Sequence, residues 1–342
     1  MTRPTLSVLL PVRDGARHLP AALRSLQAQS VPADEVIAVD DRSADATRAV
    51  LLAWSGRLPL RIVHGRGRGI AAALNDGLAA CRGEWVARMD ADDVMHPHRL
   101  REQLRYARAH PDADVVGCEV VSFPPSRVSP KRAAYDAWIS SLHTPEEHAR
   151  DLYVEAPLAH PTVTLRRAVL GAVGGYQDVR WPEDYDLWLR LHAAGARMGK
   201  PHGVLHFWRE HPDRLSRTHA DYTRDAIRRC RLHHLAAHMD LRRRGVVVVG
   251  AGLEGKAAGR TLIDEGVAVL GHVDADPRKV GGRLAGEGGV RVHPPGRLRE
   301  LLGAPSQPVA VVAIGTAGAR AGLRRELAEQ GLREGHDAVV VA

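Results

Sequence analysis

The chain contains few cysteines, and none is placed for a disulfide framework or a thiolate zinc site. Only Cys81, Cys118 and Cys230 occur in 342 residues, and no two of them have CxxC spacing. Small disulfide-stapled domains and cysteine-ligated zinc modules carry more cysteines at closer intervals. The scarcity is typical of a protein from a reducing compartment.

Long hydrophobic runs are also missing. No apolar stretch approaches the roughly 20 residues that a membrane-spanning helix needs. The first residues, Met1 to Ser7, lack the apolar core of a secretory signal peptide. We therefore expect a cytoplasmic protein rather than an integral membrane or exported one.

Aromatic residues are absent from the last part of the chain. All six Trp, six Tyr and two Phe lie at or before Tyr222. A chain of 342 residues is long for one domain, so this change in composition predicts a domain boundary. We expect a first domain over 1–212, an Arg-rich helical connector over 213–244 and a second domain over 245–342.

The formal net charge is +8, and most of the positive charge comes from arginine. Such a balance favours anionic partners, including nucleotides and phospholipid headgroups. The sequence has no nucleic-acid-binding motif and no interleaving of basic and aromatic residues. We therefore expect no nucleic acid partner.

Short apolar segments alternate with amphipathic ones through the first ninety residues, which predicts an α/β fold with a parallel sheet. Ligands of such sheets bind beyond the carboxyl ends of the strands. The polar clusters that follow the first, second and fourth segments are therefore expected to converge. The predicted strands are Leu6–Pro11, Val36–Asp40, Leu60–His64 and Trp85–Met89, and later Val115–Ser122 and His160–Arg166.

Three carboxylates follow the fourth predicted strand, at Asp90, Asp92 and Asp93. Like charges this close repel one another. A hard divalent cation with oxygen ligands, such as Mg²⁺ or Mn²⁺, would resolve the repulsion and also suits diphosphate oxygens. Taken alone, the run is equally compatible with an exposed acidic turn that caps the next helix.

Four sequence blocks occur in a fixed order through the first half of the chain. They are LPVRDG at 10–15, VDDRSADAT at 39–47, ALNDG at 73–77 and ARMDADD at 87–93. In order and spacing these blocks resemble family 2 glycosyltransferases over roughly residues 5–220, which is more specific than a lone DxD. The resemblance implies the GT-A fold and transfer of a sugar from a nucleoside diphosphate.

The resemblance also implies a donor site. Pro11 and Arg13 would line the base pocket, and Asp41 would hold the base, typically uracil, with Asp40 beside it. Two residues depart from the family pattern, because Arg13 replaces an aromatic residue and Arg42 replaces a glycine. Both departures affect the environment of the base.

The remaining donor contacts come from later blocks. The resemblance places Asp90 and Asp92 toward ribose and diphosphate, with the metal ion on Asp92 or Asp93. Asn75, in the third block, is assigned to the donor site as well. The expected donor is a UDP-sugar, and the expected cofactor is Mg²⁺ or Mn²⁺.

A second acidic segment opens the helix predicted from Trp181 to Leu191. Pro182 suits the first turn, and the acids that follow complement the helix dipole. In the resembling family, a Glu-Asp pair at such a helix marks the acceptor site. Asp184 would then be the general base that takes the proton of the acceptor hydroxyl. Glu183 would contact the acceptor or orient the base, and the reaction would be a direct displacement with inversion.

Two basic segments follow. The sequence FWREH at 207–211 looks like the family's basic segment after the acceptor helix, where Arg209 or His211 would touch the diphosphate. A structural surface role is the alternative. The stretch 214–244 carries many arginines, and we interpret it as a solvated linker helix. Peripheral contact with the anionic inner face of a membrane, near a lipid-linked acceptor, is the other interpretation.

The last hundred residues contain a glycine-rich fingerprint. GAGLEG at 250–255 follows a predicted strand and precedes a predicted helix, and the next strand ends at Asp274. This is the context of a nucleotide-binding loop, formed by Gly250, Gly252 and Gly255. Ala257 stands where a P-loop needs Ser or Thr, which excludes ATP hydrolysis.

The same segment resembles the Rossmann-like sugar-nucleotide-binding domain found before some acyltransferases. It contains no tyrosine and therefore no catalytic Tyr-Lys pair. We expect nucleotide sensing or scaffolding from it, without NAD(P) turnover.

The function that best fits the whole sequence is a metal-dependent, inverting glycosyltransferase, of hexosyl or related type. Its acceptor would be a glycan or a lipid-linked molecule. The reaction would belong to cell-surface polysaccharide or glycolipid synthesis. Two alternatives stay open. One is a non-catalytic nucleotide-binding regulatory protein. The other is a sugar nucleotidyltransferase, although the Gly-rich loop with Arg and Lys usual in that class is missing after the first strand.

Overall fold

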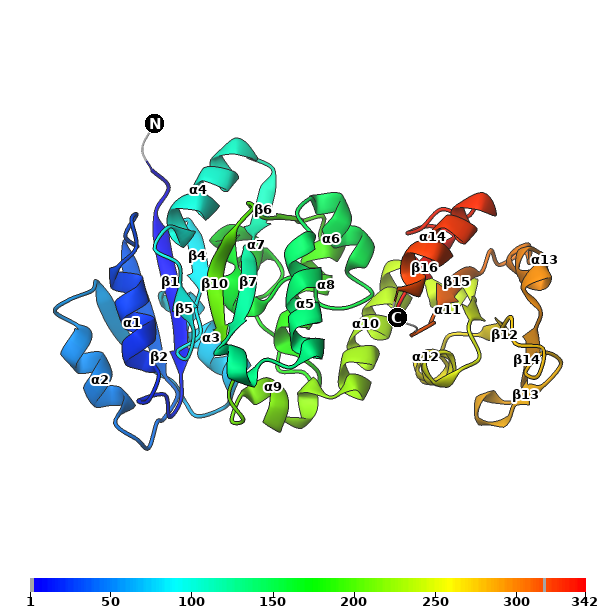
Figure 1. Cartoon of the computed structure of the whole chain (residues 1–342), viewed down its shortest axis with the longest axis horizontal. Helices are drawn as coiled ribbons and strands as arrows, with labels where there is room; N and C mark the ends of the chain where they lie inside the picture. The colour runs from blue at the N-terminus through cyan, green and yellow to red at the C-terminus, as the bar shows by residue number, and fades with distance from the viewer. Residues whose placement is uncertain (1–2, 316–317) are drawn as a thin grey trace. The chain divides into compact units, whose positions relative to one another are not determined.

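The computed structural model describes residues 3–315 and 318–342 (Figure 1). It divides into two compact units. The first unit comprises Met1–Ala149 and Pro157–His219, and the second comprises Arg150–Ala156 and Ala220–Ala342. Most of the predicted connector therefore groups with the second unit.

The first unit is built on a seven-stranded sheet with the strand order β3-β2-β1-β4-β8-β6-β9. The first four strands in the chain run parallel, as predicted, whereas β8 is antiparallel to both β4 and β6. The strands are β1 (Leu6–Val12), β2 (Glu35–Asp40), β3 (Leu60–His64), β4 (Trp85–Arg88), β6 (Ala113–Val116), β8 (Thr164–Arg166) and β9 (Arg197–Gly199).

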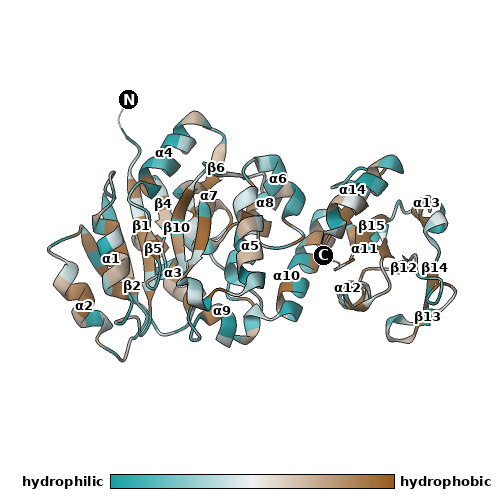
Figure 2. Cartoon of the chain, viewed as in Figure 1, coloured by the Kyte–Doolittle hydropathy of each residue, from teal (hydrophilic) through white to brown (hydrophobic). Residues whose placement is uncertain are grey.

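The sheet core is apolar and nearly solvent-free. Every residue of β1 is buried, and the side chains of Trp85 on β4 and Trp188 are among the largest that are fully enclosed. Figure 2 shows both teal and brown residues on helices such as α1 and α2, which fits one face turned to the core. The first-unit helices are α1 (Leu19–Gln27), α2 (Thr47–Trp54), α3 (Ile70–Ala80), α4 (Arg99–Ala109), α5 (Pro130–Ser141), α6 (Pro145–Asp151), α7 (Arg167–Ala172), α8 (Glu183–Ala193) and α9 (Leu215–Thr218).

A separate three-stranded sheet has the strand order β5-β10-β7. Its strand β5 directly follows the acidic run of Asp90, Asp92 and Asp93 in the chain. It contains β5 (Val94–Met95), β7 (Glu119–Phe123) and β10 (Val204–Arg209). The prediction of one strand over 115–122 is wrong, because the chain leaves the large sheet at Gly117 and enters the small one. A Cβ at Gly117 would meet the Leu158 side chain at 2.5 Å, so a glycine permits this close packing.

One other prediction in this region is wrong in extent. The strand predicted over 160–166 begins only at Thr164, because His160–Thr162 forms a 3-10 turn around Pro161. Helix α5 starts at Pro130. Ser129 caps that helix by accepting the backbone N–H of Arg132 at 3.2 Å.

The second unit contains a six-stranded sheet in the order β13-β14-β12-β11-β15-β16. All its pairings are parallel except that of β13 with β14. The strands are β11 (Val246–Val249), β12 (Val269–Val273), β13 (Arg283–Leu284), β14 (Val290–His293), β15 (Val309–Val312) and β16 (Ala338–Val340). The helices are α10 (Arg224–His238), α11 (Leu241–Arg244), α12 (Leu253–Asp264), α13 (Leu298–Leu302) and α14 (Ala319–Glu329).

Helix α10 is packed, so the prediction of a solvated linker helix is wrong. It buries one face that includes Ala226, Leu232 and Leu235. Arg228 donates from Nε to Thr261 Oγ1 on α12 at 3.2 Å. Among the described residues, no helix has both the length and the apolar character that crossing a bilayer requires.

Candidate active site

The loops after β1 and β2 are tied together at the carboxyl edge of the large sheet. Asp14 accepts the backbone N–H of Ala44 at 2.7 Å, and the backbone N–H of Asp14 donates to Ser43 Oγ at 3.0 Å. Pro11 is buried within β1, whereas the Arg13 side chain is exposed just beyond the strand. The two residues assigned to the base pocket therefore flank the end of β1.

Asp40 and Asp41 are both buried at the end of β2. Asp40 accepts the backbone N–H of Ser43 at 3.0 Å, and Asp41 accepts that of Gly67 at 2.7 Å. These bonds fix the loop geometry beside the predicted base site. Arg42, the residue after Asp41, has a φ of 59°, in the left-handed region that favours glycine. This conformation accounts for the glycine that the resembling family has at this position.

The carboxylates of Asp90, Asp92 and Asp93 form one cluster beyond β4. One oxygen of each lies within 4.8 Å of the others. Oxygen atoms at this spacing are the donor set that a hard divalent cation takes. The residues therefore fit the Mg²⁺ or Mn²⁺ predicted from the sequence.

Asp93 is the most enclosed member, with 0% of its side chain exposed. Its Oδ1 accepts the backbone N–H of Arg209 at 2.7 Å, and its Oδ2 accepts from Nε2 of His206 at 2.9 Å. Burial and the charges of Asp92 and Asp90 raise the pKa of Asp93 well above its ordinary value. This repulsion is what a cation bound at the cluster would relieve.

Asp92 is held by the basic segment that follows β10. Its Oδ2 accepts from Nε2 of His211 at 2.7 Å, and its backbone oxygen accepts from Nε of Arg209 at 2.5 Å. Burial opposes ionisation of Asp92, but the hydrogen bond from His211 and the charge of Arg214 outweigh it and lower the pKa. Arg209 and His211 thus contact the acidic run itself, and their contact with a diphosphate stays a prediction.

The three carboxylates differ in how many of their oxygens are already hydrogen-bonded. Both oxygens of Asp93 accept protein hydrogen bonds. Over residues 3–315 and 318–342, no hydrogen bond or ion pair reaches Oδ1 of Asp92 or Oδ2 of Asp90. Asp90 and Asp92 each have an oxygen available to a cation, and the assignment of the metal ion to Asp92 and Asp93 stays a prediction.

Arg88 is a buried cation at the end of β4, with 3% of its side chain exposed. Its Nη2 donates to Asp90 Oδ1 at 2.7 Å, while Nε and Nη1 have no hydrogen-bond partner among the described residues. Its charge also acts on Glu183 and Asp184. One guanidinium therefore lies within electrostatic range of both the donor cluster and the acceptor carboxylates.

Glu183 and Asp184 open α8, directly after Pro182. Glu183 is buried, with Oε1 3.7 Å from Nδ1 of His160. Asp184 is partly exposed, and burial together with the charge of Glu183 raises its pKa to about 8. A carboxyl group with a pKa this close to neutral pH is suited to taking a proton from a substrate.

Asn75 has a structural partner. Its side-chain N–H donates to the backbone oxygen of Tyr176 at 2.7 Å, and its Oδ1 accepts the backbone N–H of Tyr176 at 2.9 Å. This pair fastens α3 to the turn that precedes the acceptor segment. Both amide groups are used, so a direct donor contact by Asn75 stays a prediction.

The sequence pattern missed Arg88, His206 and Arg99. Arg99 is fully buried and contacts Nδ1 of His206 from Nη1 at 3.0 Å, and His206 in turn holds Asp93. A charged residue two positions before Asp90, inside an otherwise apolar strand, was the available signal for Arg88. His206 gave no comparable signal, because its partner Asp93 is 113 positions away.

The glycine fingerprint of the second unit lies beside a cavity of about 520 Å³. Gly250, Gly252 and Asp274 line it together with Lys279 and apolar residues that include Leu253, whose side chain is 89% exposed. Asp274 Oδ2 accepts the backbone N–H of Ala251 at 2.7 Å and Nζ of Lys279 at 3.0 Å. Asp274, the residue at which the second predicted strand ends, thus holds the glycine loop and pairs with a lysine.

Two glycines of this fingerprint have different surroundings, which allows a matched test. A Cβ at Gly255 would lie 2.1 Å from the backbone oxygen of Gly250, whereas nothing lies within 4 Å of a Cβ at Gly252. We expect Gly255→Ala to destabilise the second unit by at least about 1–3 kcal/mol, the usual cost of overpacking. Chemical denaturation should show Gly252→Ala to be as stable as the wild type. Equal stability of the two variants would contradict the packing role of Gly255.

The fold is that of the GT-A glycosyltransferases. The crystal structure of S. aureus TarS residues 1–349 in complex with UDP-GlcNAc superposes with a TM-score of 0.57 at 18% identity. The match covers 76% of this chain and 71% of TarS. At this identity the likeness shows the GT-A fold alone, with the carboxylate cluster beyond β4 of that fold.

The sequence comparisons identify the family. The profile of "Glycosyl transferase family 2" matches residues 7–174. The amylovoran biosynthesis glycosyltransferase AmsE of Erwinia amylovora is 33% identical over 194 residues, covering 55% of this chain and 70% of AmsE. An uncharacterized glycosyltransferase of Haemophilus influenzae is 30% identical over 198 residues, covering 57% and 72%. This chain belongs to glycosyltransferase family 2.

A further relative carries a more specific name. The UDP-Gal:alpha-D-GlcNAc-diphosphoundecaprenol beta-1,3-galactosyltransferase of Escherichia coli is 28% identical over 196 residues, which are 56% of this chain and 69% of that enzyme.

Proposed function

We propose that this glycosyltransferase moves a hexosyl or related group from a UDP-sugar to a hydroxyl of a glycan or lipid-linked acceptor, with inversion at the anomeric carbon. The observation that carries the proposal is the arrangement around Arg88. Its guanidinium binds Asp90 of the donor cluster, and its charge acts on Asp184 of the acceptor segment. Donor and acceptor carboxylates thus share one buried cation.

Several features support a UDP-sugar as the donor. TarS was solved with UDP-GlcNAc, and the Escherichia coli relative is named for UDP-Gal. In this chain, the buried Asp41 and the exposed Arg13 flank the end of the first two strands, where the base is expected. A carboxylate there accepts hydrogen bonds from the N–H groups of a base, and Arg13 presents a cation to the nucleotide.

The proposed chemistry is a single displacement. Asp184, once ionised, accepts the proton of the acceptor hydroxyl as that oxygen attacks the anomeric carbon. Glu183 orients the acceptor or the base. Arg209 and His211 present positive charge beside Asp92, where the leaving diphosphate gathers negative charge. Asp90 and Asp92 would hold Mg²⁺ or Mn²⁺, which would supply further positive charge beside that leaving group. One displacement with one base inverts the configuration.

The biological setting is proposed from the relatives. AmsE is named for amylovoran biosynthesis, and the Escherichia coli enzyme for a diphosphoundecaprenol acceptor. We therefore place the reaction in the cytoplasm, in polysaccharide or glycolipid synthesis, with peripheral contact at the inner face of the membrane. Several arginines of the basic stretch have acidic partners, among them Arg242 with Glu265 and Arg243 with Asp240. Membrane contact would have to use other cations.

The second unit is proposed to bind a nucleotide without converting it. Gly252 borders the cavity and has open space where a Cβ would lie, so its backbone can approach a phosphate closely. Gly252→Ala should therefore keep the fold and weaken nucleotide binding to the second unit. Titration of the nucleotide into the full chain, with the first site disabled by Asp92→Asn, measures this effect.

A donor panel tests the proposed reaction. Purified protein is incubated with UDP-, GDP- and dTDP-sugars, with and without Mn²⁺, and the released products are identified. We expect slow release of UDP from a UDP-sugar that depends on the divalent ion. Release of pyrophosphate from nucleotide and sugar phosphate would instead identify a nucleotidyltransferase. Nucleotide binding without any release, even with candidate acceptors, would favour the regulatory alternative.

A further inference from the structure

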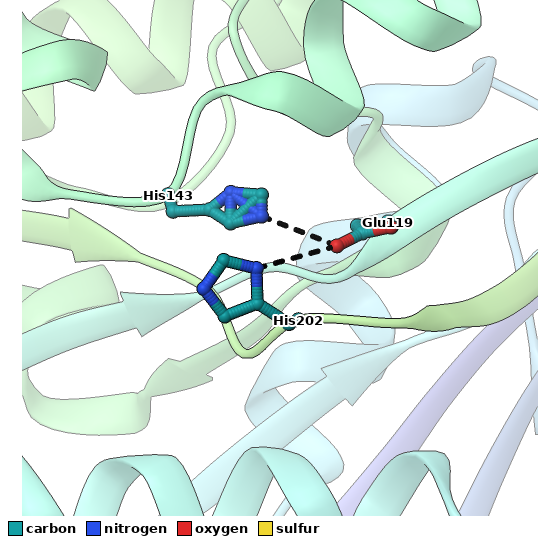
Figure 3. A group of neighbouring side chains, drawn as sticks. All are labelled: Glu119, His143 and His202. Carbon is teal, nitrogen blue, oxygen red and sulfur yellow. Dashed lines mark hydrogen bonds and ion pairs between the residues drawn. The ribbon is translucent and has the colours of Figure 1, made fainter.

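A second group of metal-type side chains lies away from the acidic run, on the small sheet of the first unit. It consists of Glu119, the first residue of β7, His143 between α5 and α6, and His202 between β9 and β10. Both imidazole rings face the same carboxylate oxygen in Figure 3. Glu119 Oε1 is 3.1 Å from Nε2 of His143 and 3.8 Å from Nδ1 of His202.

These separations fit a small tetrahedral ion. Bonds of about 2.0–2.1 Å at tetrahedral angles place two ligand atoms about 3.3–3.4 Å apart. The observed distances lie on either side of that value, and one ligand atom from each of the three residues lies within 4.8 Å of the others. Small side-chain rotations would therefore complete three protein positions of a tetrahedral site, and the fourth position would be open to water.

Two of the three ligands are already held by neighbouring hydrogen bonds. The backbone N–H of Gly203 donates to Glu119 Oε1 at 2.8 Å, and the backbone N–H of His143 donates to Glu147 Oε2 at 2.8 Å. The rings of His143 and His202 have centroids 3.9 Å apart. His202 is 87% exposed, so an ion can enter from solvent. The nearby Lys200 directs its ammonium group to the carbonyl oxygen of Ile139.

We propose that Glu119, His143 and His202 bind a borderline transition-metal cation of the Zn²⁺ type. Imidazole nitrogen suits Zn²⁺, Co²⁺ and Ni²⁺, whereas Mg²⁺ prefers oxygen atoms alone. A neutral imidazole presents one ring nitrogen with a free lone pair to a metal ion.

The site is separate from the donor cluster. It lies at the amino end of β7 and just before β10, and these two strands run parallel. Their other ends carry Phe123 and Arg209, whose guanidinium lies over the Phe123 ring and beside Asp92. An ion here would fasten three segments of the first unit at the end of the small sheet that lies away from the acidic run.

Cobalt binding tests the proposal directly. Full-length, untagged protein is stripped with a chelator, saturated with excess Mg²⁺ to occupy oxygen sites, and titrated with Co²⁺ near pH 7.5. We expect one tight equivalent with the intense visible absorption of tetrahedral Co²⁺, its displacement by Zn²⁺, and a rise in Tm with Zn²⁺. Absence of a stoichiometric Co²⁺ equivalent under these conditions would overturn the proposal.

Matched variants locate the ion. His202→Ala removes an exposed ring and should retain the fold, while weakening Co²⁺ affinity by at least about 10- to 100-fold. His110→Ala, which removes another exposed histidine of the same unit, should bind as the wild type does. Asp92→Asn should leave the cobalt spectrum unchanged. Wild-type affinity in His202→Ala, or loss of the equivalent in Asp92→Asn, would refute the assignment.

Discussion

Replacing Asp184 with asparagine is expected to reduce sugar transfer by about 100- to 10,000-fold, the range over which a positioned general base contributes. Asparagine keeps the size of the side chain but cannot take a proton. The donor cluster is untouched, so UDP affinity measured by calorimetry should stay within about twofold. Asp178→Asn, an exposed carboxylate in the preceding segment, serves as the control and should keep full activity. Near wild-type turnover in Asp184→Asn would refute the assignment of the base.

The pH profile gives an independent measure of the same residue. Burial and the charge of Glu183 raise the pKa of Asp184 to about 8, so the base is protonated and inactive below that pH. We expect kcat/KM to rise about tenfold per pH unit up to pH 8 and then to level off. Arg88 opposes the shift by lowering the pKa of Asp184. Arg88→Met should therefore move the midpoint to higher pH, and Arg88→Lys should restore it in part. If Arg88→Met leaves the midpoint unchanged, the charge of Arg88 does not influence the pKa of Asp184.

Replacing Asp92 with asparagine is expected to abolish the metal dependence of donor binding. The amide can still accept the hydrogen bond from His211, but it lacks the charge that a divalent cation and the neighbouring Arg209 and Arg214 require. Loss of a metal ligand should weaken metal-dependent UDP affinity by at least about 10- to 100-fold, as even supporting residues of metal sites do. Calorimetric titration of UDP with and without Mn²⁺ measures the difference.

A matched control keeps the Asp92 result specific. Asp112 is an exposed carboxylate of the same unit that pairs with Arg197 at 2.8 Å. Asp112→Asn changes the net charge equally and should leave UDP binding unchanged. If Mn²⁺ enhances UDP binding in Asp92→Asn as much as in the wild type, the acidic run does not hold the ion. If UDP binds to the wild type equally well with and without Mn²⁺, the proposed role of a divalent cation is wrong.

Much of the first unit could be predicted because its local pattern agrees with its fold. Apolar segments at 6–11, 36–40, 60–64 and 85–89 became β1 to β4 with boundaries shifted by at most one residue. The agreement failed where a strand crosses from one sheet to another, at Gly117. Both halves of that segment are extended and apolar, so nothing in the local pattern distinguishes one strand from two.

Within the site, the sequence predicted which side chains follow each strand but not how they pair. Asp92 and Asp93 are adjacent and chemically identical, and the sequence offered both as metal ligands. The fold distinguishes them, because His206 and Arg209 enclose Asp93 while an oxygen of Asp92 stays open. The partners are more than 100 positions away along the chain.

The sequence by itself therefore determined the α/β class, the glycosyltransferase family and the carboxylates at the ends of the strands. These depend on periodicity and short motifs, which are local properties of the chain. Only the tertiary structure decided the placement of Arg88 between the donor and acceptor carboxylates, the raised pKa of Asp184 and the meeting of Glu119 with two histidines. Each of these depends on burial and on charges brought together from distant segments, and such quantities exist only once the chain has folded.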